Sequence, residues 1–258
     1  MSKVIKIIQI NIYKGKYLGE LINFLKGENP DIILQQEVSC GKLNYTKDKT
    51  LNLFEVIKRE LGMDGAFNGD VRLEGDENSS FGNAVLTKYP ILDQKVVVLA
   101  QFRPLTFEEI EHVELIWAQV PRHVLDLVVD VSAQKVHVMS WHGAWTAPPT
   151  DTSQTLRQAN MAAKYLKSIK EPYILGVDMN NIPQSKTVAI IDKVAINHMM
   201  GSGVLQTTHP KIHKIVPRGY LIDYIFTSNH FKLKSISVPE VTVSDHLPVV
   251  AEVELISD

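Results

Sequence analysis

The sequence predicts a layered α/β (α+β) fold in which apolar strands alternate with amphipathic helices. Several short runs are rich in Val and Ile, such as Val4–Ile10, and runs of this kind predict buried β-strands. Between them, Leu, Ile and Ala recur at helical spacing, which predicts helices with one buried face. No run rich in Pro, Gly or Ser divides the 258 residues, so we expect one domain over residues 1–258 with a well-buried core.

The first sixty residues predict strand, helix, strand and a second helix. Val4–Ile10 is the first strand, and apolar residues from Leu18 follow at helical spacing until Gly27 ends the helix. Ile32–Leu34 is a short strand that leads into a polar stretch ending at Glu37, and Leu51–Leu61 is amphipathic. Ligand sites collect at such strand ends in layered α/β folds.

The middle of the chain has a less regular pattern. Gly69–Ser80 is acidic and rich in glycine, so we expect a mobile loop. Phe81–Lys88 predicts a strand, and after a Tyr-Pro turn a further strand runs through Val98. Gln101–Glu111 is a polar insertion without clear periodicity, and Val113–Val120 predicts another strand.

The second half returns to apolar strands around one long helix. Val124–Val131 and Lys135–Ser140 are separated by a short polar turn and predict an antiparallel hairpin. Asp151 is a good N-cap for the helix that follows, since a Gln stands three residues later as in a capping box. Tyr173–Val177 and Tyr220–Phe226 are two further buried strands.

Composition limits the classes of protein that remain. Apolar residues make up 45% of the chain, charged residues 22%, and the formal net charge is −2, so the total gives no sign of a long basic face for nucleic acid. The single cysteine, Cys40, rules out an intrachain disulfide and fits a reducing compartment. No apolar stretch is long enough to span a membrane. We therefore expect a cytoplasmic monomer in which Cys40 has no catalytic role.

Polar residues stand at or beside the ends of many of the predicted strands. These residues are Asn11, Glu37, His142, Asp178, Asn180, Asp223, Asp245 and His246. Groups placed in this way can converge into one cluster. Carboxylates and an amide suit a hard divalent cation such as Mg²⁺, and histidines beside such a metal suit phosphoryl chemistry. The sequence contains neither a Cys/His spacing typical of zinc sites nor a Walker-type loop.

A series of short motifs occurs in a fixed order along nearly the whole chain. They are Asn11, Gln36-Glu37, Gly82-Asn83-Ala84 before Tyr89-Pro90, His142, Asp178 with Asn180, Ile222-Asp223-Tyr224, and Ser244-Asp245-His246. In this order they resemble the endonuclease/exonuclease/phosphatase superfamily of metal-dependent phosphoesterases. The resemblance implies a four-layer α/β-sandwich, with two mixed, mainly antiparallel β-sheets face to face and helices on the outside. Two features depart from the pattern: Val177 replaces a glycine, and Trp141 and Trp145 flank the histidine motif.

The resemblance also implies roles for these residues. Glu37, helped by Asn11 and Asp245, would hold Mg²⁺ or Mn²⁺ on a phosphate oxygen. The catalytic residues would be His142, Asp178, Asn180, Asp223 and His246. Asn180 would orient Asp178, and Asp223 would orient His142. Either Asp178 or His246 would be the general base, and the number of metal ions stays open.

Substrate-binding roles are expected for Arg157, Trp145 and Asn83. Trp141, Trp145 and Tyr13 lie near the motifs and suit stacking on a base, although tryptophans in such positions also pack in cores. We therefore expect a phosphodiesterase or nuclease that acts on nucleic-acid ends or abasic sites of DNA or RNA. The alternative is a phosphatase or phosphodiesterase of small phosphorylated molecules or phospholipid headgroups, and a further alternative is a non-catalytic binding relative.

Overall fold

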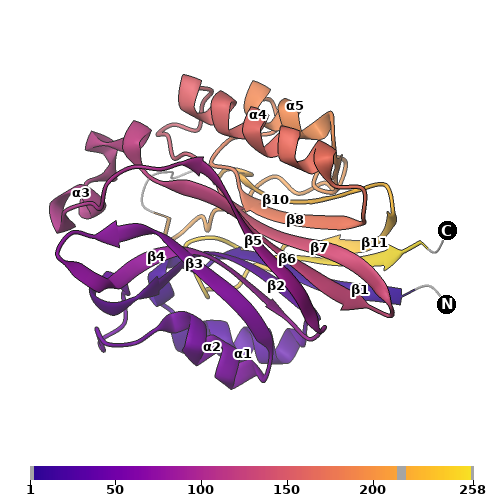
Figure 1. The fold of residues 1–258 in the computed structure, drawn as a ribbon, viewed down its shortest axis with the longest axis horizontal. Helices are drawn as coiled ribbons and strands as arrows, with labels where there is room; N and C mark the ends of the chain where they lie inside the picture. The colour runs from indigo at the N-terminus through magenta and orange to yellow at the C-terminus, as the bar shows by residue number, and fades with distance from the viewer. Residues whose placement is uncertain (1–2, 214–218, 257–258) are drawn as a thin grey trace.

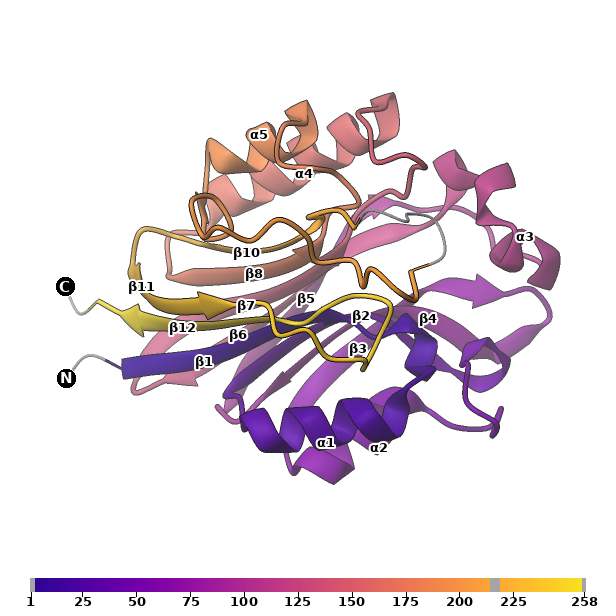
Figure 2. The same cartoon turned by 180° about the vertical axis from the view of Figure 1, so that it is seen from behind.

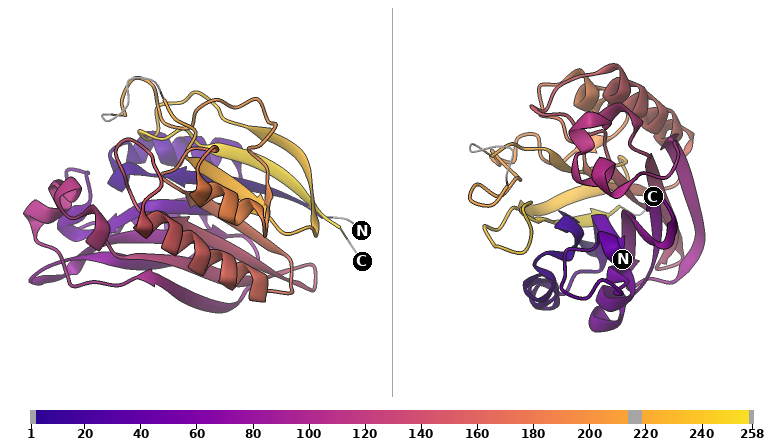
Figure 3. Two further views of the ribbon diagram at one scale, coloured as in Figure 1. Left: turned by 90° about the horizontal axis from the view of Figure 1, so that it is seen from above. Right: turned by 90° about the vertical axis from the view of Figure 1, so that its left-hand side faces the viewer.

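The computed structural model describes residues 3–213 and 219–256, which form two β-sheets of six strands each. The sheets pack face to face, and the end-on view in Figure 3 shows both strand layers between outer helices. The two chain termini lie together at one end of the sandwich, and helix α3 lies at the other (Figure 1). This architecture confirms the predicted fold class.

The first sheet has the strand order β11-β12-β1-β2-β4-β3. Its strands are β1 (Lys3–Asn11), β2 (Ile32–Cys40), β3 (Asp64–Leu73), β4 (Asp76–Thr87), β11 (Phe231–Ser237) and β12 (Val249–Leu255). Among these described strands, β1 and β2 are parallel and the other neighbours are antiparallel.

The second sheet has the order β5-β6-β7-β8-β10-β9. Its strands are β5 (Ile91–Ala100), β6 (Arg122–Val131), β7 (Gln134–His142), β8 (Tyr173–Asp178), β9 (Ile196–Asn197) and β10 (Asp223–Thr227). Here β7 and β8 are parallel, and the other described neighbours are antiparallel. Each sheet is therefore mixed and mainly antiparallel.

Helices cover the outer face of each sheet and complete the four layers (Figures 1 and 2). The first sheet carries α1 (Leu18–Glu28) and α2 (Leu53–Leu61), and the second carries α4 (Ser153–Ser168) and α5 (Lys186–Asp192). The shorter helical pieces are η1 (Tyr13–Gly15), η2 (Gly41–Leu43), α3 (Phe107–Glu111), η3 (Val113–Leu115) and η4 (Trp117–Gln119). Within the two described ranges, none of the helices combines the length and apolar character of a membrane span.

Strand β1 is largely apolar because both of its faces are buried. Ile5 and Ile7 belong to the core between the sheets, whereas Ile8 and Ile10 pack beneath α1 and α2. A strand buried on both faces needs apolar side chains at nearly every position. Gln9 is the exception, since it lies on the inner face and is fully buried.

The predicted mobile loop Gly69–Ser80 is wrong, because it forms the turn and the adjoining halves of the strands in the β3–β4 hairpin. Leu73 pairs with Asp76 across a two-residue turn, in which Gly75 has a φ of 73° that favours glycine. Val71 and Phe81 are buried on one face of the hairpin. The alternation of apolar and polar residues within this acidic segment was the signal for strands.

The predicted strand Val113–Val120 is also wrong. It consists of the 3₁₀ helices η3 and η4, which follow α3. A capping box between Thr106 and Glu109 starts α3 within the insertion that had no clear period. Leu115 is 71% exposed while Val113, two residues earlier, is half-buried, so burial does not follow the period of two expected for a strand.

Asp151 is not the N-cap of α4 as predicted. Thr152 caps α4 with a capping box, and Asp151 instead accepts hydrogen bonds from the backbone N–H groups of Lys186 and Thr187, 2.9 Å each. These N–H groups begin α5, so Asp151 ties the starts of two neighbouring helices together. The sequence analysis missed α5 along with β9 and β11.

Candidate active site

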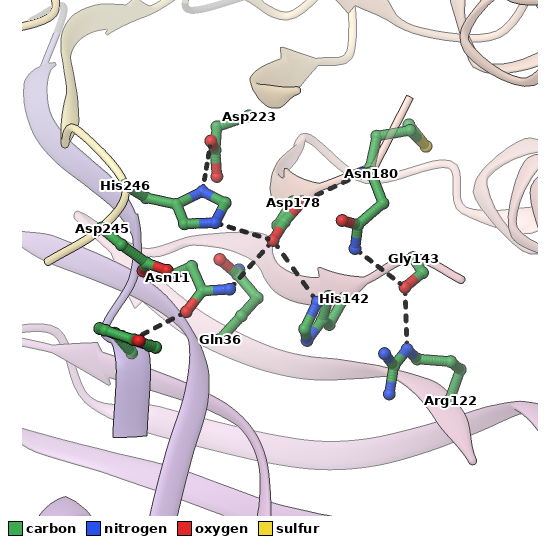
Figure 4. Close-up of polar contacts among 12 residues, drawn as sticks. Asn11, Gln36, Arg122, His142, Gly143, Asp178, Asn180, Asp223, Asp245 and His246 are labelled. Carbon is green, nitrogen blue, oxygen red and sulfur yellow. Dashed lines mark hydrogen bonds and ion pairs between the residues drawn. The ribbon is translucent and has the colours of Figure 1, made fainter. Parts of the chain in front are cut away.

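A cavity of about 470 Å³ opens where strands from both sheets end. Its lining includes most of the predicted site residues, namely Asn11, Glu37, His142, Trp145, Asp178, Asn180, Asp245 and His246. Figure 4 shows how Asp178 lies among several of these side chains, with Asp223 joined to His246 on the side away from Asp178. Eight of the predicted residues, far apart in sequence, therefore share one cavity.

Strand register brings the second sheet's residues together. His142 pairs with Asp178 in the parallel β7–β8 ladder, and Asp178 pairs with Asp223 in the antiparallel β8–β10 ladder. Asp178 thus has a site residue as its neighbour on each side. In the first sheet, the register of the parallel β1–β2 pair sets Asn11 beside Gln36.

Glu37 reaches the cavity through an irregularity in β2. The pairing of β2 with β4 shifts between Gln35 and Val38, and Glu37 has a φ of 54°. Such a conformation is costly for a residue other than glycine and is typical of functional sites. Within the described residues the Glu37 carboxylate forms no hydrogen bond or ion pair. Its charge is therefore free to bind a ligand.

The Asp178 carboxylate is the centre of the polar network. It accepts hydrogen bonds from Asn11 Nδ2 and from the backbone N–H of Asn180, 3.0 Å each. The Nε2 atoms of His142 and His246 lie 3.4 Å and 3.7 Å from Asp178 Oδ2. Burial, together with the charge of Asp223, raises the pKa of Asp178 to about 7, although His246 opposes the shift.

His246 forms a buried ion pair with Asp223. Its Nδ1 donates to Asp223 Oδ2 over 2.8 Å, which leaves Nε2 facing Asp178. Burial lowers the pKa of His246, but Asp223, Asp178 and Asp245 outweigh it and raise that pKa well above the usual value. The expectation that Asp223 orients His142 is therefore wrong, because Asp223 holds His246.

His142 has the opposite electrostatic environment. Burial lowers the pKa of His142 well below its usual value, and the positive charges of Arg122, His246 and Lys14 add to this effect. These shifts favour the neutral form of His142 and the protonated form of His246. The two histidines are therefore suited to different roles.

A network of amides links the two sheets beneath the site. Gln9 and Gln36 exchange two hydrogen bonds of 2.8 and 2.9 Å, and Gln9 also donates to Asp223 Oδ1 over 3.0 Å. Gln36 donates to Ser140 Oγ in the facing sheet. A Cβ on Gly176 would lie 2.6 Å from Leu34 and 3.0 Å from Gln9, so glycine at 176 gives these groups room.

The model of the Endonuclease/Exonuclease/phosphatase family matches residues 8–246. The chain belongs to this family. Its members hydrolyse phosphoester bonds, and the chain is a hydrolase of this class. None of the curated proteins compared with the chain matches it.

Solved structures of the family share the fold at low sequence identity. An endonuclease/exonuclease/phosphatase from Bacteroides vulgatus is 18% identical with a TM-score of 0.74, over 98% of this chain and 99% of that chain. A mannosyl-6-phosphatase from Bacteroides thetaiotaomicron is 16% identical with a TM-score of 0.73, over 98% and 100%. The human Nocturnin catalytic domain with bound sulfate is 15% identical with a TM-score of 0.67, over 98% and 97%.

The carboxylates of Glu37 and Asp245 fit the divalent metal that this family generally uses. Burial and the charge of Glu37 raise the pKa of Asp245 to about 6, although His246 opposes the shift. Two neighbouring carboxylates with no cation between them are unfavourable, and a divalent cation with oxygen ligands relieves this repulsion. The Asn11 side-chain oxygen, which accepts only the Tyr13 N–H among the described residues, has a lone pair left for the same ion.

Among the residues that the structure describes, two groups of His, Asp or Glu side chains have donor atoms close enough to hold a metal. They are His213, Asp245 and His246, and Asp178, Asp223 and His246. Both sets include His246, whose Nδ1 is already hydrogen-bonded to Asp223. Glu37, Asp245 and Asn11 offer an oxygen-only alternative.

Several residues of the cavity were not predicted from the sequence, and four of them carry a positive charge, an imidazole or a phenol. Lys14, Tyr45, Arg122 and His213 all line it. Arg122 is almost fully buried and donates to the Gly143 carbonyl over 2.8 Å, to which Asn180 Nδ2 also points at 3.4 Å. A single charged residue at the start of the apolar strand β6 was the available signal. No sequence pattern marks Lys14, whose backbone has a φ of 49° and whose side chain is buried.

The remaining predicted residues lie elsewhere. Arg157 is exposed on α4 and donates to Gln154, and it does not line the cavity. Asn83 is fully buried and donates to the His123 carbonyl. Trp141 packs in the core between the sheets, so it is not free to stack on a base. The substrate-binding roles of Arg157 and Asn83 stay predictions.

Proposed function

We propose that this chain is a divalent-metal-dependent phosphoesterase whose metal is held by Glu37, Asn11 and Asp245. The observation that carries the proposal is the arrangement of Asp178 between Asn11, His142 and His246 in one cavity with Glu37 and Asp245. Mg²⁺ or Mn²⁺ fits a set of oxygen ligands, and when bound it offsets the negative charge that builds on the phosphate.

Asp178 is the general base of this proposal. A base is most effective when its pKa lies near the working pH, and the pKa of Asp178 is raised to about 7. Asp178 accepts the proton of the attacking water while the Asn180 N–H and Asn11 hold its carboxylate in place. The charged His246 cannot accept a proton, so it donates a hydrogen bond to a phosphate oxygen or protonates the leaving group.

His142 and Asn180 bind the phosphate in this scheme. Neutral His142 presents Nε2 to the cavity beside Asp178, and the Asn180 side chain lies next to it with only a long contact to Gly143. Donors aimed at the phosphate oxygens stabilise charge that develops in the transition state.

The test is hydrolysis of bis(p-nitrophenyl) phosphate with Mg²⁺ or Mn²⁺, with excess chelator, and after the metal is restored. We expect turnover to disappear in chelator and to return with metal. Glu37→Gln should raise the metal concentration needed for half-maximal rate by more than about tenfold. Glu20→Gln, on exposed α1, is the matched control. Full activity in chelator would contradict the proposal.

Two substrate classes are candidates, nucleic acids and small phosphoesters. Trp145 and Tyr13 line the cavity and favour stacking on a base, which supports hydrolysis at a nucleic-acid end or abasic site. Glu111 and Glu114 also line it, and their carboxylates disfavour a polyanion. On the balance of charge we place small phosphoesters first and nucleic acid second. The single domain, cytoplasmic location and monomeric state stay predictions.

A further inference from the structure

Six apolar residues of the cavity lining have no part in the chemistry proposed above. This apolar wall consists of Val71, Phe81, Leu105, Ile110, Val113 and Val120. With the exception of half-buried Val113, all of these side chains are at least nine-tenths buried against one another, in a cluster separate from the main core. An apolar surface that continues into a polar site is typical of small-molecule pockets.

The apolar wall is held in shape by backbone hydrogen bonds. Leu105 N–H donates to the Arg72 carbonyl over 2.9 Å, and Glu74 N–H donates to the Leu105 carbonyl over 2.8 Å. These bonds fasten the start of the insertion to the β3–β4 hairpin, and the Thr106–Glu109 capping box then orders α3. The apolar wall therefore exists before a ligand binds, which lowers the entropic cost of binding.

Lys14 marks the boundary between the apolar wall and the polar end of the cavity. It is only 7% exposed, and its ammonium lies 4.7 Å from the centre of the Phe81 ring and 4.9 Å from that of Tyr45. In the described part of the chain it forms no ion pair with a carboxylate. A buried cation without an anionic partner favours an anionic ligand.

The distribution of charge limits what can enter. The cations Lys14 and Arg122 are buried inside the cavity, whereas Glu111 and Glu114 line it from exposed positions. A ligand with one anionic group and an otherwise neutral body matches this pattern, and a chain of phosphates does not. The volume of about 470 Å³ is in the range of small-molecule sites.

We propose that the substrate is a phosphate ester with a compact alkyl or aryl group, and that this group lies on the apolar wall while Lys14 pairs with the anionic end. The inference rests on the proposed function and adds its substrate class. Because the group is neutral and apolar, affinity depends on the surface that it buries.

Alkyl- and arylphosphonates test this without any turnover. Binding of methyl-, butyl-, hexyl- and phenylphosphonate to the native protein with Mg²⁺ is measured by titration calorimetry. Methylphosphonate reports the phosphate site alone. We expect affinity to rise about threefold to fourfold per added methylene until the apolar wall is covered. Phenylphosphonate should also bind more tightly than methylphosphonate.

Two variants locate the effect. Val113 is half-buried, so it can be replaced by a polar residue. Val113→Asn and the nearly isosteric Val113→Thr should weaken hexylphosphonate binding by at least about fivefold and leave methylphosphonate binding unchanged. Leu115→Asn is the matched control, since Leu115 is 71% exposed in the same segment and does not line the cavity.

Each other result overturns the inference. If affinity does not rise with the length of the alkyl group while the protein keeps metal-dependent turnover, the substrate class is refuted and the proposed function is left intact. Tighter binding of a 5′-phosphorylated trinucleotide than of hexylphosphonate, unchanged by Val113→Asn, would indicate nucleic acid instead. No binding of methylphosphonate together with no turnover would overturn both proposals.

Discussion

The polar end of the cavity and the apolar wall differ in where they come from. The polar end is built by the ends of strands in both sheets, and Asp178, Asp223 and His246 are almost fully buried there. His246 lies between the two carboxylates, 2.8 Å from Asp223 and 3.7 Å from Asp178. The apolar wall comes from the β3–β4 hairpin and the segment 105–120, and its side chains offer no polar groups. The polar groups thus stand on the sheet scaffold, whereas the apolar wall is formed by segments beyond it.

The largest effects are expected at the polar end. Asp178→Asn and His246→Ala should each lower kcat by about 10²–10⁴-fold, because a positioned acid or base contributes that much. The double variant should be little worse than the poorer single variant, since residues that act as one unit are not additive. Steady-state kinetics measure kcat of each variant, and circular dichroism verifies that the variants are folded.

A second His–Asp pair supplies the control for this prediction. His137 Nδ1 lies 2.7 Å from Asp126 Oδ2, much like His246 and Asp223, but His137 does not line the cavity. His137→Ala should therefore leave kcat nearly unchanged. If His246→Ala keeps more than about a tenth of native kcat, its assigned role is wrong.

A smaller effect, on KM, is expected at the border of the cavity. Trp145 lines it and is half-buried, so Trp145→Ala should raise KM by about tenfold, the loss of one stacking contact. Melting temperature should change little, because Trp145 lies outside the main core cluster. Trp141→Ala is the contrast, since Trp141 is in that core and should lower stability by about 3–5 kcal/mol. A large fall in melting temperature for Trp145→Ala with unchanged KM would make it a core residue.

The buried charges also predict how stability depends on pH in the metal-free protein. The folded-state pKa values of Asp178 and Asp245 are raised to about 7 and 6, and that of His246 is raised above its usual value. In each case the folded state holds more protons than the unfolded state, so stability falls as pH rises. His142, with its lowered pKa, has the opposite effect below pH 6.5.

Metal-free protein should therefore melt at a lower temperature at pH 8.5 than at pH 6.5. Saturating Mg²⁺ should reduce the difference, since a cation near Asp245 and Glu37 stabilises the ionised carboxylates. Thermal melts at both pH values, with and without metal, measure this, and Val113→Asn should show the same pH dependence as the native protein. A melting temperature that rises between the two pH values would contradict the assignment of these charges.

The smallest effect is expected at Cys40, which is buried and does not line the cavity. Burial raises the pKa of its thiol, which disfavours the reactive thiolate. Cys40→Ser should keep kcat and KM within about twofold in the same assay. A loss of turnover in folded Cys40→Ser would show that the active site extends beyond the cavity described here.

The sequence by itself determined which residues end buried strands. Alternating and continuous apolar runs encode burial, so the polar residue that follows such a run, as at Asn11, His142 and Asp178, can be located without a structure. The resemblance carried by the motifs implied the four-layer fold. Local patterns were also enough for the β6–β7 hairpin and for the approximate positions of α1, α2 and α4.

Only the tertiary structure decided which of these residues meet. Asp223 holds His246 rather than His142 because the β8–β10 register and the path before β12 place them 2.8 Å apart, and no local pattern records that register. Lys14 and Arg122 enter the site through backbone turns and strand packing. The apolar wall arises where a segment without periodicity packs on a hairpin distant in sequence, and such contacts between remote segments are set by the whole fold.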